Sequence, residues 1–166
     1  MSAMDAIDAV CDRLKTIDGI GPNVYNMLRN AVSEAQFKQL FVDAATDPAN
    51  PIVHAWRVTR VGFIDRDEAM NAVRRIHSIE ISGFMSFKDG ITEPIFQGVV
   101  DAIADAFDPL GGGNGSHLRK FVDADHPDGR FDWSGPMTGT GPRLGTLGNV
   151  VVHAMVLNYP VEEFPL

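Results

Sequence analysis

The stretch "IVHAWRVTRVGFIDRDEAMNAVRRIHSIEISGFMSF" (52–87) decides the fold. Its first part, 52–64, is rich in β-branched and aromatic residues, and its last part, 73–87, alternates apolar with polar residues. Both patterns are typical of strands. The charged segment between them, 65–72, is too short for a crossover connection. The stretch therefore predicts an antiparallel hairpin with an exposed tip.

Strands of about 13 residues extend ~40 Å, which is more than a domain of this size needs for its own core. An arm of this kind typically packs against a neighbouring molecule, and a solvated hairpin end is the alternative. The candidate interface residues are the charged side chains at the tip and at the foot of the returning strand: Arg60, Asp65, Arg66, Asp67, Glu68, Arg74 and Arg75.

Upstream of the hairpin, a helix is expected over residues 3–17, where apolar residues, including the single cysteine Cys11, recur at helical spacing. Gly19 and Gly21 end this helix. The stretch "GIGPNVYN" (19–26) then has two interpretations. A second helix directly after the glycines would make a helix-hairpin-helix DNA-binding domain, but basic residues to meet phosphates are scarce here. We favour a turn from helix to strand, with the glycines at positive φ.

Two further helices are expected, one on each side of the hairpin. Ser33 followed by Gln36 fits a capping box. It precedes a short helix whose apolar face is formed by Phe37, Leu40, Phe41 and Ala44. The strongest helical pattern begins near Thr92, which we predict to be the N-cap. Its apolar stripe is formed by Ile95, Val99, Ile103 and Phe107.

The C-terminal part is expected to hold a long flexible loop and one strand. Residues 111–148 are rich in Gly and Pro with little periodicity, and they predict a loop with room for one strand. Residues 149–161 are apolar on both faces, as expected of a central strand covered by helices. The whole chain, 1–166, is therefore predicted to be a single α+β domain with helices packed on a mixed, mostly antiparallel sheet.

Composition limits the function. The 166 residues are 45% hydrophobic and carry 14 basic and 22 acidic side chains, for a net charge of −8. This excess of acid disfavours general nucleic-acid affinity, which needs clustered cations. No apolar run approaches the ~18 residues of a membrane span. The acidic start of the chain does not match a secretory signal, so we expect no export.

No catalytic or metal motif stands out, so we expect no enzyme and no cofactor. The segment "DADHPDGRFD" (123–132) is similar to a calcium loop, but its spacing is wrong by one residue and the bidentate Glu is missing. A small hydrolase using His126 and a cation is the alternative, and it predicts loss of activity in Asp125→Ala. Three histidines fall in predicted strands, where hydrogen-bonded core side chains are common: His54, His77 and His153.

The elements follow one another in a recognisable order. A helix ends "L-x-x-I-x-G-I-G", then come an apolar helix "FKQLF", a strand "VHAWRVTR" and a returning strand "RRIHSIEISGFMSF". A helix "FQGVVDAIADAF", a Gly-rich loop and a strand "VVVHAMVLNYPVEE" complete the chain. This order resembles the tail terminator (tail completion) proteins of long-tailed bacteriophages over nearly the whole chain. The likeness is one of element order and apolar signature, and no invariant catalytic motif is part of it.

The resemblance implies a virion structural protein of the phage neck that is not an enzyme and is assembled in the host cytoplasm. Its protomers would form a hexameric ring that caps the tail tube at its head-proximal end and stops polymerisation of the tube. The ring would also bind a head-completion or connector protein and let genomic DNA pass through its lumen without specific binding, which suits an acidic chain. Another neck protein, for head closure or the tail tube itself, is the alternative within the same machine.

The resemblance also assigns roles to segments. Segment 60–75 corresponds to the arm that contacts neighbours or the tube. Val24, Tyr25 and Met27 would enter the sheet after the glycine turn. The loop 111–148 would contact the connector, with these candidate residues: Arg119, Lys120, Asp123, Asp125 and Asp128.

Overall fold

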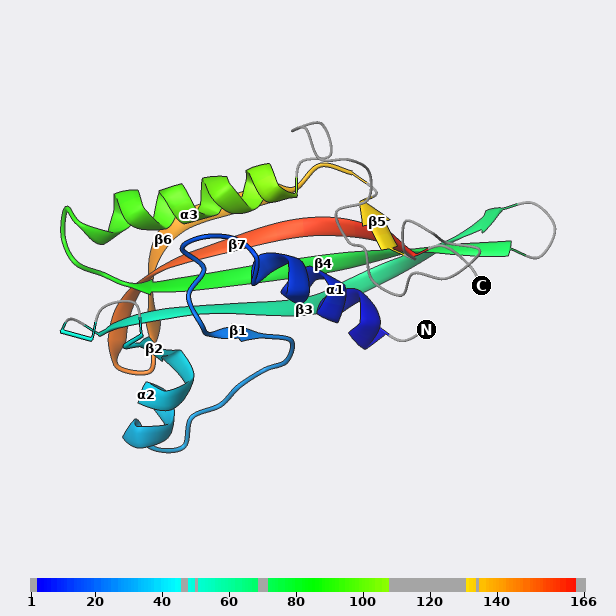
Figure 1. The fold of residues 1–166 in the computed structure, drawn as a ribbon. Helices are drawn as coiled ribbons and strands as arrows, with labels where there is room; N and C mark the ends of the chain where they lie inside the picture. Colours follow the sequence, from blue (N-terminus) through cyan, green and yellow to red (C-terminus); the bar gives the residue numbers. More distant parts are fainter. Residues whose placement is uncertain are drawn as a thin grey trace.

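The computed structural model describes residues 3–45, 48–49, 51–68, 72–107, 131–133 and 135–163. Within these residues the chain forms three helices and seven strands (Figure 1). The helices are α1 (Ala3–Leu14), α2 (Glu34–Phe41) and α3 (Thr92–Ala106). The strands are β1 (Val24–Tyr25), β2 (Val42–Asp43), β3 (Ile52–Glu68), β4 (Ala72–Ser86), β5 (Phe131–Trp133), β6 (Thr138–Leu147) and β7 (Val150–Glu163).

All seven strands join one sheet. β3 and β4 form the antiparallel hairpin, and β7 pairs antiparallel with the other edge of β4. The outer edge of β7 takes β5 and β6 at different heights, both antiparallel. The outer edge of β3 takes β2 antiparallel and β1 in parallel. The prediction of an α+β fold with a mixed, mostly antiparallel sheet is therefore confirmed.

The strands of the hairpin are longer than predicted. β3 continues past residue 64, and the segment 65–72, predicted to be an exposed tip, is largely strand. In the register of the continuation, Asp65 lies opposite Arg75, which favours pairing, whereas Arg66 lies opposite Arg74. A register shift between Arg60 and Gly62 marks a bulge in β3.

Most of the hairpin belongs to the body of the sheet. β4 pairs with β7 from Arg75 to Ser86, so only the part of the hairpin beyond Arg75 extends past β7. Figure 1 shows this end leaving the sheet without folding back on the body. The predicted arm is therefore much shorter than ~40 Å, because β7 pairs with β4 along most of the hairpin.

The core lies between one face of the sheet and the two helices α1 and α3 (Figure 1). Trp56 of β3 is fully buried there, as is Phe96 of α3, and their rings stack at 5.8 Å between centroids. Cys11 of α1 is also buried, as the helical pattern predicts. The sheet contributes the alternating residues that the sequence indicates, Ile79, Ile81 and Met85.

The predicted details of α3 are partly wrong. Ile95, expected in the apolar stripe, is 54% exposed, and Phe96 takes its place in the core. The other three residues of the predicted stripe, Val99, Ile103 and Phe107, are buried as expected. The error is therefore confined to the first turn, where Phe96 packs on Trp56. Thr92 is not the N-cap, since Ile91 occupies that position. The Thr92 hydroxyl instead accepts a hydrogen bond from the Lys88 backbone N–H at 2.8 Å.

The glycine turn after α1 leads into a strand. α1 ends at Leu14, earlier than the predicted residue 17, and Gly19 and Gly21 adopt φ of 85° and 73°. β1 follows and pairs with β3, whereas Met27 lies outside the strand and is 46% exposed, so its predicted place in the sheet is wrong. Residues 22–32 contain no helix, which removes the second helix of a helix-hairpin-helix module.

The helix α2 is capped as predicted, but it contributes no fully buried residue. The Ser33 hydroxyl accepts a hydrogen bond from the Gln36 backbone N–H at 3.2 Å, and the Gln36 side chain accepts one from the Val32 N–H at 3.0 Å. Phe37 and Phe41 pack at 5.2 Å on its apolar face, while Ala44, expected on that face, lies beyond the helix. The stability of so short a helix depends strongly on its N-terminal cap.

We therefore expect Ser33→Ala to destabilise α2 by about 0.5–2 kcal/mol, because one N–H of the first turn loses its acceptor. Amide hydrogen exchange is the measurement: the amides of α2 should exchange roughly tenfold faster. Amides in the middle of β4 serve as the internal control and should not change. Unchanged exchange in α2 would contradict the role given to Ser33.

The prediction of a loop with room for one strand over residues 111–148 is partly wrong, because the described second half forms two strands. β5 and β6 lie there, and the first half, up to residue 130, lies outside the described residues. The sequence pattern does not indicate β6, because the glycines that resemble loop residues are there to allow close packing. A Cβ at Gly139 would lie 2.8 Å from Leu157 Cδ2, and Gly141 has a φ of 122°. β7, in contrast, is confirmed as an interior strand between β4 and the β5–β6 edge.

Candidate functional site

The charged candidates of the predicted arm lie along the end of the hairpin. Arg60, Asp65 and Arg66 are on β3, and Arg74 and Arg75 are on β4. The remaining candidates, Asp67 and Glu68, are the last residues of β3.

Ion pairs join the described strands at this end of the hairpin. Arg75 Nε and Nη2 donate to the two carboxylate oxygens of Asp65 at 2.6 and 2.9 Å. These hydrogen bonds lower the pKa of Asp65 and raise that of Arg75. Arg74 Nη1 donates to Glu162 Oε1 of β7 at 2.9 Å, which ties the hairpin to the sheet. Three of the predicted charges, Asp65, Arg74 and Arg75, therefore pair within the chain.

Three apolar side chains lie exposed beside these charges, and sequence analysis missed them. Val61, Phe63 and Ile64 are 59%, 50% and 60% exposed. The Phe63 ring is flanked by the guanidinium groups of Arg60 and Arg75, at 4.9 and 4.7 Å from its centroid. The bulge near Gly62 changes which side chains face the core, and a bulge has no clear signal in this sequence.

The backbone at the same place is open for pairing. β2 and β1 cover the outer edge of β3 only as far as residue 57, so within the described residues β3 has no outer partner from 58 to 68. At the opposite side of the sheet, β5 and β6 likewise have no outer partner in the described part of the chain. Open edges with exposed apolar side chains are typical of surfaces that pair with another chain.

A buried histidine links three strands at the base of this end. His77 is 1% exposed, its Nε2–H donates to Glu163 Oε2 at 2.8 Å, and its Nδ1 lies 3.5 Å from Arg60 Nη1. Burial lowers the pKa of His77, with Arg60 and Arg75 acting in the same direction and Glu163 opposing them. His77 therefore stabilises the structure in its neutral form.

Mild acid is expected to destabilise the fold. Burial lowers the pKa of both His54 and His77 from the ordinary value of 6.5. The unfolded chain then takes up protons at a higher pH than the folded chain does, so stability is full above about pH 6.5 and decreases as the pH falls toward the folded-state pKa. Urea midpoints measured from about pH 8 to about pH 5 should show this decrease, and a smaller one in His77→Gln. A constant midpoint across this range would disprove the assignment.

A second polar cluster lies at the other end of the core. Asp43 and His54 are 2% and 5% exposed, and Asp43 Oδ2 lies 4.0 Å from His54 Nδ1. His54 Nε2 accepts a hydrogen bond from Trp56 Nε1–H at 3.2 Å, which places the imidazole proton on Nδ1. Trp56 thus occupies the position that a nucleophile takes beside an Asp–His pair. This pair cannot act as a triad.

All three strand histidines behave as predicted, since each is buried and hydrogen-bonded. His153, 3% exposed, lies with Nε2 at 3.1 Å from the Thr92 hydroxyl. In the residues described here, no three potential metal ligands gather. The calcium-like segment 123–132 falls almost entirely outside the described residues, and so do the five loop candidates: Arg119, Lys120, Asp123, Asp125 and Asp128.

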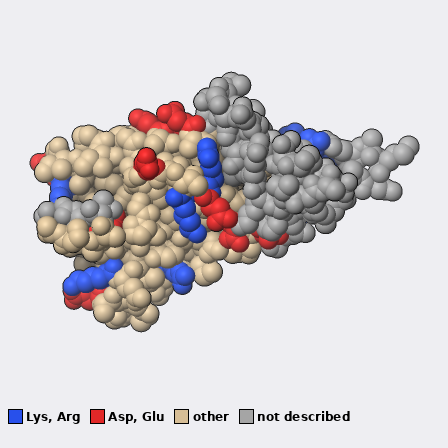
Figure 2. All heavy atoms as spheres, viewed as in Figure 1, with Lys and Arg blue, Asp and Glu red and all other residues tan. Residues whose placement is uncertain are grey.

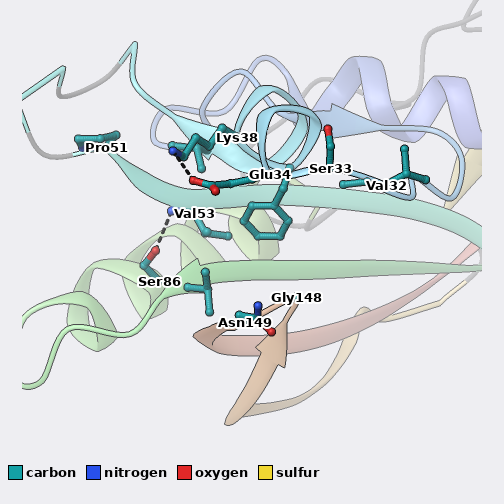
Figure 3. Close-up of a pocket in the computed structure, with 13 residues that line it drawn as sticks. Val32, Ser33, Glu34, Lys38, Pro51, Val53, Ser86, Gly148 and Asn149 are labelled. Carbon is teal, nitrogen blue, oxygen red and sulfur yellow. Dashed lines mark hydrogen bonds and ion pairs between the residues drawn. The ribbon is translucent and has the colours of Figure 1, made fainter.

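A groove of about 670 Å³ lies between α2 and the turn that joins β6 to β7. Figure 3 shows Lys38 and Glu34 paired at its rim, where Lys38 Nζ lies 2.6 Å from Glu34 Oε1. Ser86 accepts a hydrogen bond from the Val53 N–H at 2.7 Å along one wall. The described lining is mostly apolar and brings together no residues of a known catalytic arrangement.

Several acidic side chains lie on α3. Figure 2 shows acidic groups over α3, where Glu93, Asp101 and Asp105 are exposed. The opposite face of the sheet is closer to neutral: Arg57 lies 3.7 Å from Glu80 and donates to the Ser82 hydroxyl at 3.3 Å.

No model of a known protein family matches the chain, and no curated protein sequence matches it. None of the helices in the described part is long and apolar enough to cross a bilayer.

Proposed function

We propose that this chain is a structural protein of a phage neck, a tail terminator that works as a closed ring of identical copies. The ring, hexameric in the family that the sequence resembles, caps the tail tube, stops its polymerisation and offers a docking surface to head-completion proteins. The observation that carries this proposal is a pair of sheet edges, one on β3 and one on β5, that have no outer partner among the described residues and lie at opposite sides of the sheet.

The two edges match in direction and height. β3 and β7 run one way, and β4 and β5 run the other, so a neighbour's β3 placed beside β5 would pair antiparallel and continue the alternation. The register also places the free part of β3 level with β5, in one row across the sheet: Asp65, Arg75, Glu163 and Phe131. A contact between two different edges repeats from copy to copy and closes into a ring when its rotation permits.

The side chains support the same contact. Val61, Phe63 and Ile64 supply exposed apolar surface beside the free edge of β3. β6 is less suited to pairing, since Pro142 and a register shift interrupt it. The sheet face around Arg57 and Glu80 is near neutral, because the guanidinium of Arg57 lies beside the carboxylate of Glu80. Such a face suits a lumen through which DNA passes without specific binding.

Co-assembly with tail tubes tests the proposal. Light scattering should give a mass several times the 18.1 kDa of one chain, and electron microscopy should show the protein at one end only of tubes that have stopped growing. Protein distributed along the tubes would instead indicate a tube protein, and binding to the head connector alone a head-closure protein. A single chain that ignores both would overturn the assignment to a phage neck.

A further inference from the structure

A cavity of about 510 Å³ opens between the first half of α3 and the ends of β2 and β3. Its volume lies within the roughly 300–1,000 Å³ of pockets that hold small organic molecules. Apolar side chains form most of the described wall: Ile52, Met85, Ile91, Ile95 and Val99. Two of them, Ile91 and Ile95, are 60% and 54% exposed, so the mouth of the cavity offers apolar surface to a ligand.

The described lining of the cavity includes a carboxylate. Asp43 lines it and is 2% exposed, with Oδ1 accepting a hydrogen bond from the Ala45 N–H at 2.9 Å. Its Oδ2 faces His54 Nδ1 at 4.0 Å, and His54 also lines the cavity. Space for this pair depends on Gly21, where a Cβ would lie 3.1 Å from both Asp43 Oδ2 and His54 Nδ1.

The chemistry of this pair restricts the ligand. A metal ion would need the lone pair of His54 Nδ1, but the hydrogen bond from Trp56 to Nε2 places the proton on Nδ1. An anion would be repelled by the carboxylate. An ammonium group gains a charge-assisted hydrogen bond in a site of low dielectric, and an attached alkyl chain gains burial against the apolar wall.

We propose that this cavity binds an alkylammonium group, with its charge toward Asp43 and its chain against Ile91 and Ile95. The group belongs either to a free amine or to a lysine side chain of a second copy of this chain. Lys88 also lines the cavity, and it is exposed to solvent. The inference is independent of the phage assignment, since it uses a different part of the molecule.

Calorimetric titration of the full chain tests it with three probes of equal chain length: n-hexylammonium, n-hexanol and n-hexanoate. We expect the ammonium to bind at least about tenfold more tightly than the alcohol, and hexanoate not to bind. Asp43→Asn keeps the shape of the side chain and should abolish the preference for the ammonium. Equal affinity for amine and alcohol, or no binding of any probe, would overturn the proposal.

A matched pair of exposed positions keeps the test decisive if Asp43→Asn does not fold. Ile95→Gln removes apolar surface at the mouth and should weaken amine binding several-fold, whereas Leu144→Gln, at a 60% exposed position on β6 outside the cavity, should leave it unchanged. Equal effects of the two changes would count against the site. Light scattering during the titration separates the two sources: a constant mass indicates a free amine, and a mass that falls as amine is added indicates a lysine of a second copy.

Discussion

Ile64→Lys is expected to convert the proposed ring into single chains. Ile64 is 60% exposed on the part of β3 that has no outer partner in the described residues. Lysine on an edge strand opposes pairing, since a partner strand would have to cover its charge. The fold itself should lose no more than about 0.5 kcal/mol, because the side chain is exposed in the single chain. Light scattering gives the mass, and urea unfolding verifies the fold.

The matched control for this experiment is Leu28→Lys. Leu28 is 72% exposed, but it lies between β1 and α2 and away from the open part of β3. The same gain of charge should therefore leave the proposed ring intact. If both variants assemble, the edge of β3 is not the contact. If both fail to assemble, net charge rather than the edge controls association.

Gly83→Ala is expected to unfold the protein or destabilise it by at least about 1–3 kcal/mol. An added Cβ would lie 2.7 Å from Cη2 and 2.8 Å from Cε3 of Trp56, and closer still to its Cζ3. The indole has little room to move, because it is fully buried, stacks on Phe96 and donates a hydrogen bond to His54. Urea unfolding of the soluble fraction measures the loss.

Gly62→Ala provides the control in the same hairpin. A Cβ at Gly62 would meet no atom within 4 Å, so its unfolding free energy should change by no more than about 0.5 kcal/mol. The double variant Gly83→Ala, Trp56→Leu should be more stable than the sum of its two single changes predicts, since a smaller side chain admits the new methyl. Simple additivity would mean that the indole is not the obstacle.

The sequence predicts elements whose pattern is local. The alternation around Ile79 and Ile81 indicates β4, and the spacing of Ser33 and Gln36 indicates the cap of α2. The turn at Gly19 is likewise predicted, because positive φ is a property of single residues. In each case the residues that form the signal also form the structure.

Features that depend on distant partners could not be predicted. In the sequence, the glycines of β6 indicate a loop, and only their close packing against β7 explains why they occur in a strand. Ile95 and Phe96 fit the helical pattern equally well, and only the position of Trp56 decides which is buried. The candidate site was predicted in part, since the charged residues at the hairpin end were named from the sequence. The exposed apolar residues around Phe63 were not predicted, because their exposure depends on a bulge. The open edge of β3 was not predicted either, because it depends on how short β1 and β2 are.

The bidentate pair between Arg75 and Asp65 and the bond from Arg74 to Glu162 have a further consequence. A flexible hairpin end would lose backbone and side-chain freedom on docking, and association would be weaker by that entropy. Here the ion pairs position these side chains of the described strands before a partner binds. Binding at this end should therefore resemble the meeting of two rigid bodies, with little folding coupled to it and a correspondingly modest change in heat capacity.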